Sequence, residues 1–470
     1  MALEDRLYKF LSSYKAMPDW VKIILASPSR MFPRYMLLGK YYKVFYEEAK
    51  MFEFAPKGKI QDYQLMKLQI LLQHCYSTVP FYRDTWNEYG VNINNINSLD
   101  DFSNSIPYLT RSMVQNHPEQ FISQKYKPSM RLKMNSGGST GIPLTLYYLK
   151  GFTRAAEWAH MHLQWSRVGY TIGKPMATLR GDYMGKNRMF SFDPFRNTLM
   201  LSSYKLNKSN ADFYLDLLVK YKIEYINAYP ASLYNLVQLS KYKSRMIPSL
   251  KVVFLGSENI FEWQLQKFSE FFQIERIFYW YGHGEVCALG GGCEYSSDYH
   301  FFPTYSYVEF SSDMGKDSNT DSNQTVEIVG TSYVNPLMPL IRYKTQDYGI
   351  VENNECRCTR KHKKLSRVIG REQEIALGLN GEKITLTALI FGRHADYFHH
   401  IIKMQIVNYN YGKLRIKIIP KSTFDDSHKR EIIDTLSVKQ GMPFESEVEI
   451  VDHIESTARG KHKFLIQEIK

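Results

Sequence analysis

The stretch from residue 225 to residue 272 decides the fold class. It holds two apolar runs, YINAY (225–229) and KVVFL (251–255), and each is followed by a segment with helical apolar spacing (231–239 and 261–272). Short β-rich runs that alternate with helical segments are typical of α/β layers. We therefore expect a large α/β domain of layered sheets and helices.

The composition changes at Gly370 and Arg371. Beyond them, between residues 403 and 451, short β-rich runs flank a helical pattern at 425–437, which indicates a small α+β unit. A chain of 470 residues is also too long for one simple core. We expect three parts: a helical, Tyr- and Lys-rich segment (1–60), a large domain (61–370) and a small mobile C-terminal domain (371–470).

Charge and composition narrow the function classes. The net charge of +13 lies entirely before residue 372, because the remainder carries fourteen basic and fourteen acidic residues. A basic body can attract nucleotides, coenzyme phosphates, nucleic acid or an anionic membrane, or serve solubility alone. No nucleic-acid-binding motif is present, so we expect no such partner. The aromatic segment 1–60 either docks on the body or touches a membrane surface.

The location and redox state follow from what the sequence lacks. No apolar run approaches the roughly 20 residues of a membrane-spanning helix, and the first ten residues do not resemble a signal peptide. We expect a cytoplasmic protein with five reduced cysteines, free to bind metal. The sequence leaves the oligomeric state open.

Polar motifs follow two of the apolar runs. Gly256, Ser257 and Glu258 come directly after 251–255, and ligands of open α/β sheets bind beyond the carboxyl ends of strands. The motif YGHGE follows another apolar run, from Tyr281 to Glu285. An aromatic ring, flexible backbone and a carboxylate suit an adenine face and a Mg²⁺ ligand.

A compact polar loop, NSGGSTGIP, occupies residues 135–143. Glycine lets backbone N–H groups approach an anion closely, and hydroxyl groups add donors, so the loop suits phosphates. The plainer alternative is an exposed hairpin turn. The candidate phosphate contacts are Ser136, Gly137, Gly138, Ser139, Thr140 and Gly141.

Three further elements complete an ordered set. RYKTQD ends at Asp347, whose carboxylate can accept hydrogen bonds from both hydroxyl groups of a ribose. The pair Gly370-Arg371 marks the composition boundary, and RGKHK (459–463) lies near the C-terminus.

This order and spacing resemble the adenylate-forming (acyl/aryl-CoA ligase) superfamily. The phenylacetate–CoA ligase-like branch is the most similar, including its CapK-type members associated with bacterial surface polysaccharide synthesis. The resemblance begins near Gln64-Leu65 and the segment VPFYR (79–83), and it ends at the Gly-Lys pair at 460–461.

The resemblance implies a role for each motif. The loop at 136–141 would hold the β- and γ-phosphates of ATP, and Glu285 would coordinate Mg²⁺. Asp347 would bind the ribose, Arg371 would lie at the hinge between the domains, and Lys461 would reach the carboxylate and the α-phosphate. The adenine and acyl pocket would be lined by Gly256, Ser257, Glu258, Tyr281 and Gly282.

Three positions depart from the pattern of the superfamily. Ile142 stands where many members have Lys, Gln346 replaces a usual Gly before the ribose Asp, and Glu374 replaces a frequent Asp at the hinge. Of the two lysines near the C-terminus, Lys461 is favoured over Lys463 because a glycine precedes it.

The chemistry explains these residue types. Attack of a carboxylate on the α-phosphate of ATP builds negative charge, which Mg²⁺ and a lysine ammonium offset. A thiol or an amine then displaces AMP from the acyl-adenylate, and a mobile small domain allows one site to serve both steps. We expect ATP, Mg²⁺, a carboxylic acid and CoA or another thiol or amine acceptor.

Four residues predict a second metal site. Cys293 and His300 are seven residues apart, and Cys356 and Cys358 form a Cys-x-Cys pair. Together they supply the four ligands of a closed tetrahedral Zn²⁺ site with a structural role. A zinc there would hold the adenine-side loop to the segment that leads into the hinge. The alternative is a set of unrelated reduced thiols and a surface histidine.

Two other functions stay open. The protein could stop at adenylylation, as a nucleotidyltransferase of the same branch. It could also be a degenerate scaffold of the same fold at the membrane, although Glu285, Asp347 and Lys461 are retained.

Overall fold

The structure is a computed structural model, and all structural statements refer to the residues that it describes. Apart from the isolated positions 17 and 21, these are residues 38–135, 144–180, 188–203, 205–258, 260–311, 323–352, 355–371, 375–379, 381, 383–385, 397, 400–436, 444–455 and 463–469.

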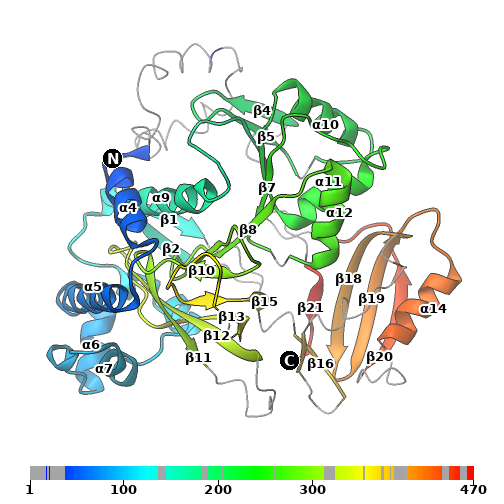
Figure 1. The fold of residues 1–470 in the computed structure, drawn as a ribbon. Helices are drawn as coiled ribbons and strands as arrows, with labels where there is room; N and C mark the ends of the chain where they lie inside the picture. The colour runs from blue at the N-terminus through cyan, green and yellow to red at the C-terminus, as the bar shows by residue number, and fades with distance from the viewer. Residues whose placement is uncertain are drawn as a thin grey trace.

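A nine-stranded sheet forms the middle of the molecule (Figure 1). Its order is β14-β10-β9-β8-β7-β6-β3-β5-β4, and the five strands from β8 to β5 run parallel. β4, β9, β10 and β14 are antiparallel to their neighbours. The strands are β3 (Met176–Leu179), β4 (Phe190–Asp193), β5 (Thr198–Leu201), β6 (Tyr225–Ala228), β7 (Val252–Gly256), β8 (Ile277–Gly282), β9 (Leu289–Gly292), β10 (Tyr299–Phe301) and β14 (Lys364–Leu365).

Helices cover both faces of this sheet, so its central strands are apolar throughout. In β7, Val252 and Phe254 pack on the side of α9 (Thr153–Ser166), whereas Val253 and Leu255 pack on the opposite side. Successive residues of a strand point to opposite faces, which makes an uninterrupted apolar run a doubly covered strand. The opposite side is covered by α10 (Ala211–Lys220), α11 (Pro230–Leu239) and α12 (Glu262–Phe272).

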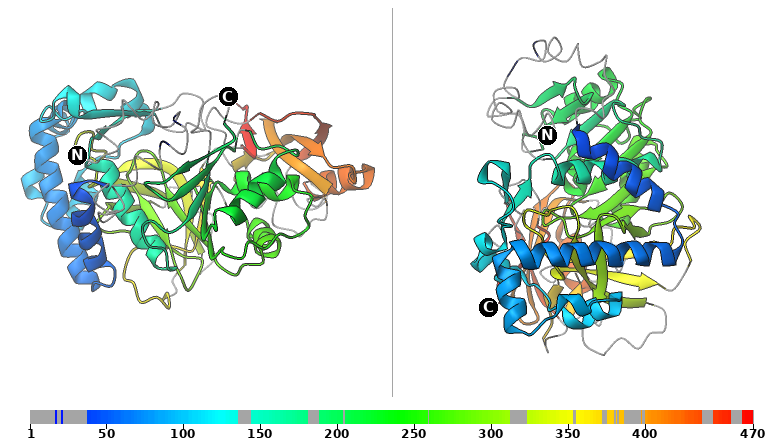
Figure 2. Two further views of the ribbon diagram at one scale, coloured as in Figure 1. Left: turned by 90° about the horizontal axis from the view of Figure 1, so that it is seen from above. Right: turned by 90° about the vertical axis from the view of Figure 1, so that its left-hand side faces the viewer.

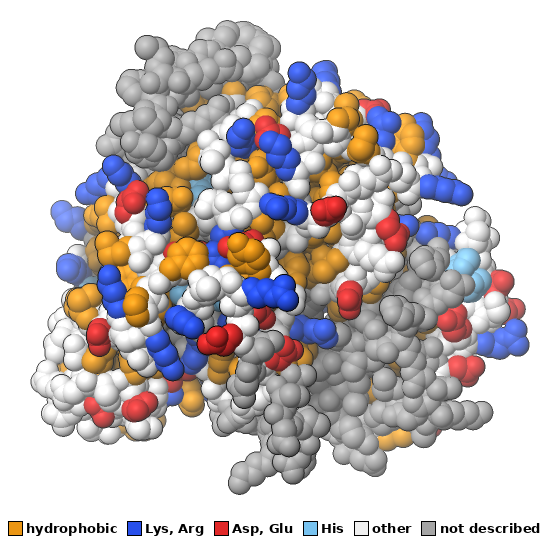
Figure 3. Space-filling model, in the orientation of Figure 1, with side chains coloured by type: hydrophobic (Ala, Val, Ile, Leu, Met, Phe, Trp, Pro, Cys, Tyr) orange, Lys and Arg blue, Asp and Glu red, His pale blue; other side chains and the backbone are white. Residues whose placement is uncertain are grey.

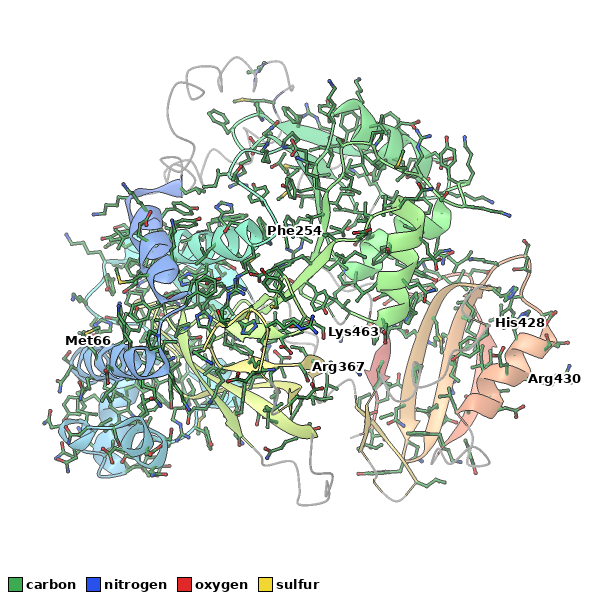
Figure 4. The ribbon with its side chains drawn as sticks, viewed as in Figure 1. Met66, Phe254, Arg367, His428, Arg430 and Lys463 are labelled. Atoms are coloured by element: carbon green, nitrogen blue, oxygen red, sulfur yellow. The ribbon has the colours of Figure 1, made fainter. Side chains whose placement is uncertain are left out.

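Phe254 marks the centre of the α9 side (Figure 4). It is fully buried, and its ring stacks on that of Trp165 with centroids 4.8 Å apart. The predicted runs at 225–229 and 251–255 thus form β6 and β7, and the α/β fold class is confirmed.

Helices build the end of the molecule opposite the C-terminal sheet (Figures 1 and 2). The longest of them is α5, and Pro80 occupies the first turn of the helix that follows it, α6. The helices are α4 (Lys40–Phe52), α5 (Lys57–Thr78), α6 (Pro80–Glu88), α7 (Leu99–Ser105) and α8 (Arg111–Asn116).

Two smaller β units pack beside the central sheet. An antiparallel hairpin pairs β1 (Arg131–Asn135) with β2 (Thr145–Leu149). A four-stranded antiparallel sheet has the order β11-β12-β13-β15. Its strands are β11 (Ser306–Ser311), β12 (Asn323–Ser332), β13 (Tyr343–Glu352) and β15 (Arg367–Arg371).

The C-terminal part is a second four-stranded sheet with a helix on it, as the sequence predicts. Its order is β20-β19-β18-β21, with β18 (Ile401–Asn410) antiparallel to β19 (Lys413–Pro420). β20 (Glu445–Ile450) and β21 (Leu465–Gln467) pair parallel to their neighbours. The helix is α14 (Asp426–Thr435), and the short strands β16 (Ile375–Leu377) and β17 (Lys383–Thr385) precede the sheet. The mobility of this part stays a prediction.

The surface in Figure 3 carries Lys and Arg side chains spread over the described elements, interspersed with Asp and Glu. Among the described helices, none combines the length and the apolar character that crossing a membrane requires.

Candidate functional site

The carboxyl ends of the parallel strands form one edge of the central sheet, where the predicted motifs at 256–258 and 281–285 meet Asp347. In register, Leu255 of β7 lies beside Tyr279 of β8, so Gly256 is level with Trp280. A Cβ atom on Gly256 would come within 2.5 Å of the Trp280 ring, so only glycine lets that ring lie over the end of β7. The binding of a ligand at this edge stays a prediction.

Ser257 and Glu258 have specific partners. Ser257 has a φ of 68°, in the left-handed region, and its hydroxyl accepts a hydrogen bond from the guanidinium of Arg180. The Glu258 carboxylate accepts a hydrogen bond of 3.0 Å from the backbone N–H of Ala231, at the first turn of α11. Glu258 thus stabilises the N-terminus of a helix beside the edge, while its predicted contact with the adenine or acyl group stays a prediction.

Tyr281 and Asp347 join two sheets. The Tyr281 hydroxyl of β8 donates a hydrogen bond of 2.7 Å to the Asp347 carboxylate of β13, and both residues are buried. The Asp347 N–H in turn donates to the Thr345 hydroxyl at 3.1 Å. The predicted adenine-side ring and ribose-side carboxylate are therefore in direct contact, although 66 residues separate them.

Gln346 occupies a position that favours glycine. Its φ is 59°, and its N–H donates to the Glu327 carboxylate at 3.1 Å, where β12 and β13 shift register. A positive φ costs a residue with a side chain of order 1 kcal/mol. The departure from the usual glycine thus retains the backbone geometry that places Asp347.

Glu285 lies buried between two basic side chains. One carboxylate oxygen is 3.3 Å from Nη1 of Arg111, and the other is 3.0 Å from Nδ1 of His283. The carboxylate offers the oxygen ligands that Mg²⁺ prefers, and Arg111 and His283 fix its orientation. These residues fit a Mg²⁺ site with Glu285 as its ligand.

The hairpin that carries the candidate phosphate loop is fixed to this motif. The Tyr148 hydroxyl of β2 donates a hydrogen bond to the backbone carbonyl of Gly284. Asn135 pairs with Thr145 across β1 and β2, so residues 136–144 connect the two strands. The loop residues Ser136, Gly137, Gly138, Ser139, Thr140 and Gly141 lie outside the described residues, as does Ile142.

The segments around Arg371 and Lys461 are described in part. Arg371 ends β15, where its backbone pairs with Asp347, and the preceding Gly370 has a φ of 110° that favours glycine. The Arg371 side chain, Glu374 and Lys461 lie outside the described residues. Figure 4 shows Lys463 at the start of β21, on the side of the C-terminal sheet that faces Arg367.

A ring contact joins the C-terminal sheet to the central layers. The Phe464 ring lies 5.6 Å from that of Phe261, at the start of α12. Phe464, three residues after Lys461, therefore packs against the large α/β part of the molecule.

The four predicted zinc ligands come together. The Sγ atoms of Cys293 and Cys356 are 3.5 Å apart, and the Sγ of Cys358 lies 3.3 Å from Nε2 of His300. All four candidate ligand atoms lie within 4.8 Å of one another. In a tetrahedral zinc site with bonds of 2.0–2.3 Å, ligand atoms are about 3.3–3.8 Å apart, so the donor set and its spacing fit Zn²⁺.

Of the four ligand residues, His300 and Cys356 have pKa shifts that favour metal binding, whereas Cys358 has a shift that opposes it. Burial lowers the pKa of His300 to about 3, which keeps its imidazole neutral. Burial alone would raise the pKa of Cys356, but hydrogen bonds from Ser296 and neighbouring groups lower it. Burial raises the pKa of Cys358 to about 12, so metal binding would have to displace its proton.

The cluster lies at the other edge of the sheet. β9 runs antiparallel to β8, with Gly291 beside Trp280, so Cys293 lies toward the amino end of β8. We expected a zinc there to hold the adenine-side loop. The register shows that it would instead tie the β9–β10 turn to residues 356–358, remote from the ligand-binding edge.

A charged network packs beside the cluster. Arg167 and Arg360 both contact the Glu53 carboxylate, at 2.8 and 2.7 Å, and Arg360 also binds Glu294 at 2.8 Å. Burial alone would raise the pKa of Glu53, but the two guanidinium groups outweigh it and lower the pKa to about 2. Each charge in this network thus has an opposite charge beside it.

The comparisons with known proteins agree with this geometry. Residues 379–468 match the family model of the CapK C-terminal domain. Over 446 residues, the chain is 20% identical to Protein CapK of Staphylococcus aureus, covering 92% of this chain and 94% of that protein. The chain is thus similar over most of its length to members of the adenylate-forming superfamily.

Two further comparisons agree with this similarity. The chain is 21% identical over 338 residues to phenylacetate-coenzyme A ligase of Thermus thermophilus, covering 69% of this chain and 73% of that protein. The solved structure of 2-hydroxyisobutyryl-CoA ligase with 2-HIB-AMP in the postadenylation state shares the fold, with a TM-score of 0.69 and 17% identity. The match covers 88% of this chain and 91% of the chain in that structure.

Two arginines near the predicted motifs were missed by sequence reasoning. Arg111 opens the short helix α8 and contacts Glu285 across 174 residues of chain. Arg180 directly follows β3 and contacts Ser257. Neither stands in a motif, and only the rule that ligands bind beyond the carboxyl ends of strands could have singled out Arg180.

Proposed function

We propose that the protein activates a carboxylic acid with ATP as an acyl-adenylate and then transfers the acyl group to CoA or to another thiol or amine. The observation that carries the proposal is the direct contact between Tyr281 and Asp347. Tyr281 belongs to the same YGHGE motif as Glu285. A ring, a ribose-binding carboxylate and a metal-binding carboxylate are the groups that a bound ATP requires.

Each residue has a defined task in this proposal. Tyr281 offers a ring face to the adenine, and Asp347 accepts hydrogen bonds from the ribose hydroxyls. Glu285 would hold Mg²⁺, which when bound neutralises charge on the phosphates. Arg111, in contact with Glu285, orients that carboxylate, and Lys461 would donate to the carboxylate of the acid and to the α-phosphate.

A pyrophosphate-exchange screen tests this function. The purified protein, with ATP and Mg²⁺, is supplied with aryl, fatty, amino and sugar acids, and acid-dependent exchange is the expected result. ATP binding without exchange for any acid would indicate a degenerate scaffold. AMP transfer to a non-carboxylate acceptor would indicate a nucleotidyltransferase.

We propose further that Cys293, His300, Cys356 and Cys358 hold a structural Zn²⁺. The spacing of their ligand atoms and the burial of the cluster support this. Metal analysis should find about one zinc per chain, and none in a Cys356→Ser/Cys358→Ser variant. A fully folded wild type without zinc would contradict it.

A further inference from the structure

Arg180 is held at the ligand-binding edge by neutral groups. Nη1 donates to the Asn227 side-chain carbonyl at 3.3 Å, and Nη2 donates to the Ser257 hydroxyl. The guanidinium carbon lies 4.6 Å from the ring centre of Tyr229 and 5.3 Å from that of Trp280. Aromatic faces attract a cation but do not neutralise it.

Other buried guanidinium groups of the protein have carboxylate partners. Arg111 contacts Glu285, Arg342 contacts Glu309, and Arg360 contacts Glu53. Within the described part of the chain, no carboxylate lies within 4 Å of Arg180, which is itself half-buried. A charge removed from water without a counter-charge is costly, unless a ligand supplies that charge.

The strand register places this cation on one side of the sheet. Arg180, Tyr229, Gly256 and Trp280 occupy the same level of neighbouring parallel strands. Side chains at one level share a face, and Trp280 packs in the core on the α9 side. Tyr281, the next residue, points to the other face, where it contacts Asp347.

The two faces of β8 therefore offer different ligands. The ribose-binding carboxylate lies on the Tyr281 side, and the uncompensated cation lies on the Trp280 side. The hairpin β1–β2 also packs on the Trp280 side, through Leu132 and Tyr148. A substrate bound to Arg180 would therefore lie on the opposite face of β8 from the ribose-binding carboxylate.

We propose that Arg180 binds a second anionic group, a carboxylate, on the acid that the enzyme activates. This rests on the proposed function. β3 is three strands away from β8, so the backbones of Arg180 and Trp280 are about 14 Å apart, and the guanidinium reaches across that span. In this arrangement Lys461 would serve the reacting carboxyl group, Glu285 would hold Mg²⁺, and Arg180 would bind the far end of the acid. The substrate class is thus dicarboxylic.

Matched pairs of acids test the proposal by pyrophosphate exchange. Butyrate is compared with succinate, hexanoate with adipate, and benzoate with terephthalate. The wild type should prefer the anionic member of a pair by about tenfold in kcat/KM, the scale of one charged hydrogen bond. Arg180→Met should abolish this preference without changing the KM for ATP, and Arg180→Lys should retain part of it.

Arg245→Met is the control. Arg245 also lies over a tyrosine ring, at 4.8 Å from Tyr242, but it is paired with Asp216 at 2.9 Å. It should leave the preference unchanged. Equal loss of exchange with both members of each pair in Arg180→Met, or no preference in the wild type, would overturn the proposal.

A binding measurement separates this proposal from the proposed function. Thermal unfolding is followed with the same acids in the absence of ATP. If dicarboxylates raise the unfolding temperature of the wild type but not of Arg180→Met, the Arg180 site stands even if no acid supports exchange. If neutral acids support exchange but dicarboxylates do not raise the unfolding temperature, the proposed activity stands and the Arg180 site is ruled out.

Discussion

Two buried charged clusters lie at opposite edges of the central sheet, and they differ in how their charges are balanced. At the amino edge, Glu53 contacts two arginines, and Arg360 contacts two glutamates. At the carboxyl edge, Arg180 has aromatic and neutral partners, and Glu285 has one arginine and one histidine.

The difference separates a structural cluster from a functional one. Where every charge is paired, burial is offset internally, and the cluster holds α4, the β9–β10 turn and residues 356–360 together. Where the pairing is incomplete, the site gains stability from a ligand that completes it. Substitutions should therefore affect folding at one edge and catalysis at the other.

The largest expected effect lies at the carboxyl edge. Lys461→Ala should lower pyrophosphate exchange by about 10²–10³-fold, because it removes a charge-stabilising donor at the α-phosphate, and it should leave ATP binding largely intact. Lys463→Ala is the matched control, and its effect should be much smaller. Wild-type exchange in Lys461→Ala would rule out its assigned role.

Glu53→Gln should act on stability alone. It leaves two buried guanidinium groups short of a counter-charge, and we expect the free energy of unfolding to fall by about 3 kcal/mol. Urea denaturation measures the loss. The exchange activity per folded molecule should stay unchanged. A loss of activity in the folded variant would show that the Glu53 cluster also affects catalysis.

Glu285→Gln should show the reverse pattern. The variant leaves one guanidinium, that of Arg111, short of a counter-charge, whereas Glu53→Gln leaves two, so we expect a smaller loss of stability, about 1–2 kcal/mol. It loses the charge that holds Mg²⁺, and exchange should fall by about 100-fold and respond to higher Mg²⁺. A stability loss as large as that of Glu53→Gln would mean that both clusters support folding, which would contradict the division into a structural and a functional cluster.

The smallest effect concerns a neutral buried group outside both clusters. Burial lowers the pKa of His160 to about 4, against about 6.5 when unfolded, and Nδ1 lies 2.8 Å from the Ala156 carbonyl. The unfolded chain takes up the proton first as the pH falls, so stability is lost between pH 6.5 and 4. This residue should contribute about 1 kcal/mol of loss from pH 7.5 to 5.5.

Urea titrations at these two pH values, with His160→Gln as the comparison, measure that loss. The variant should lose less stability on acidification than the wild type does. An identical pH dependence in the two proteins would mean that the pKa of His160 is the same in the folded state as in the unfolded chain.

The sequence predicts the fold well where local pattern decides it. Uninterrupted apolar runs predict β6 and β7, and the zinc-type ligands are predicted from residue type and spacing and found together. Contacts between distant segments have no local signal. Arg360 meets Glu53 across 307 residues, and Arg111 meets Glu285 across 174. Such pairs follow from the docking of helices and loops on the sheet.

Register explains the remaining difference. From spacing alone, a zinc site near the YGHGE motif suggests a place beside the adenine. One antiparallel strand of four residues, β9, carries the chain from the carboxyl edge to the amino edge before Cys293. A short antiparallel strand of this kind moves a metal site to the opposite edge of the sheet without changing the spacing of its ligands in the sequence.

Because of Gly256, the effects of substitutions at positions 180, 256 and 280 should depend on one another. A methyl group there would push against the Trp280 ring, and a displaced ring would release one face of the Arg180 guanidinium. Gly256→Ala and Arg180→Met should therefore cost less together than the sum of their separate effects on acid affinity. A library that varies position 180 for new acids should keep glycine at 256, or vary position 280 at the same time.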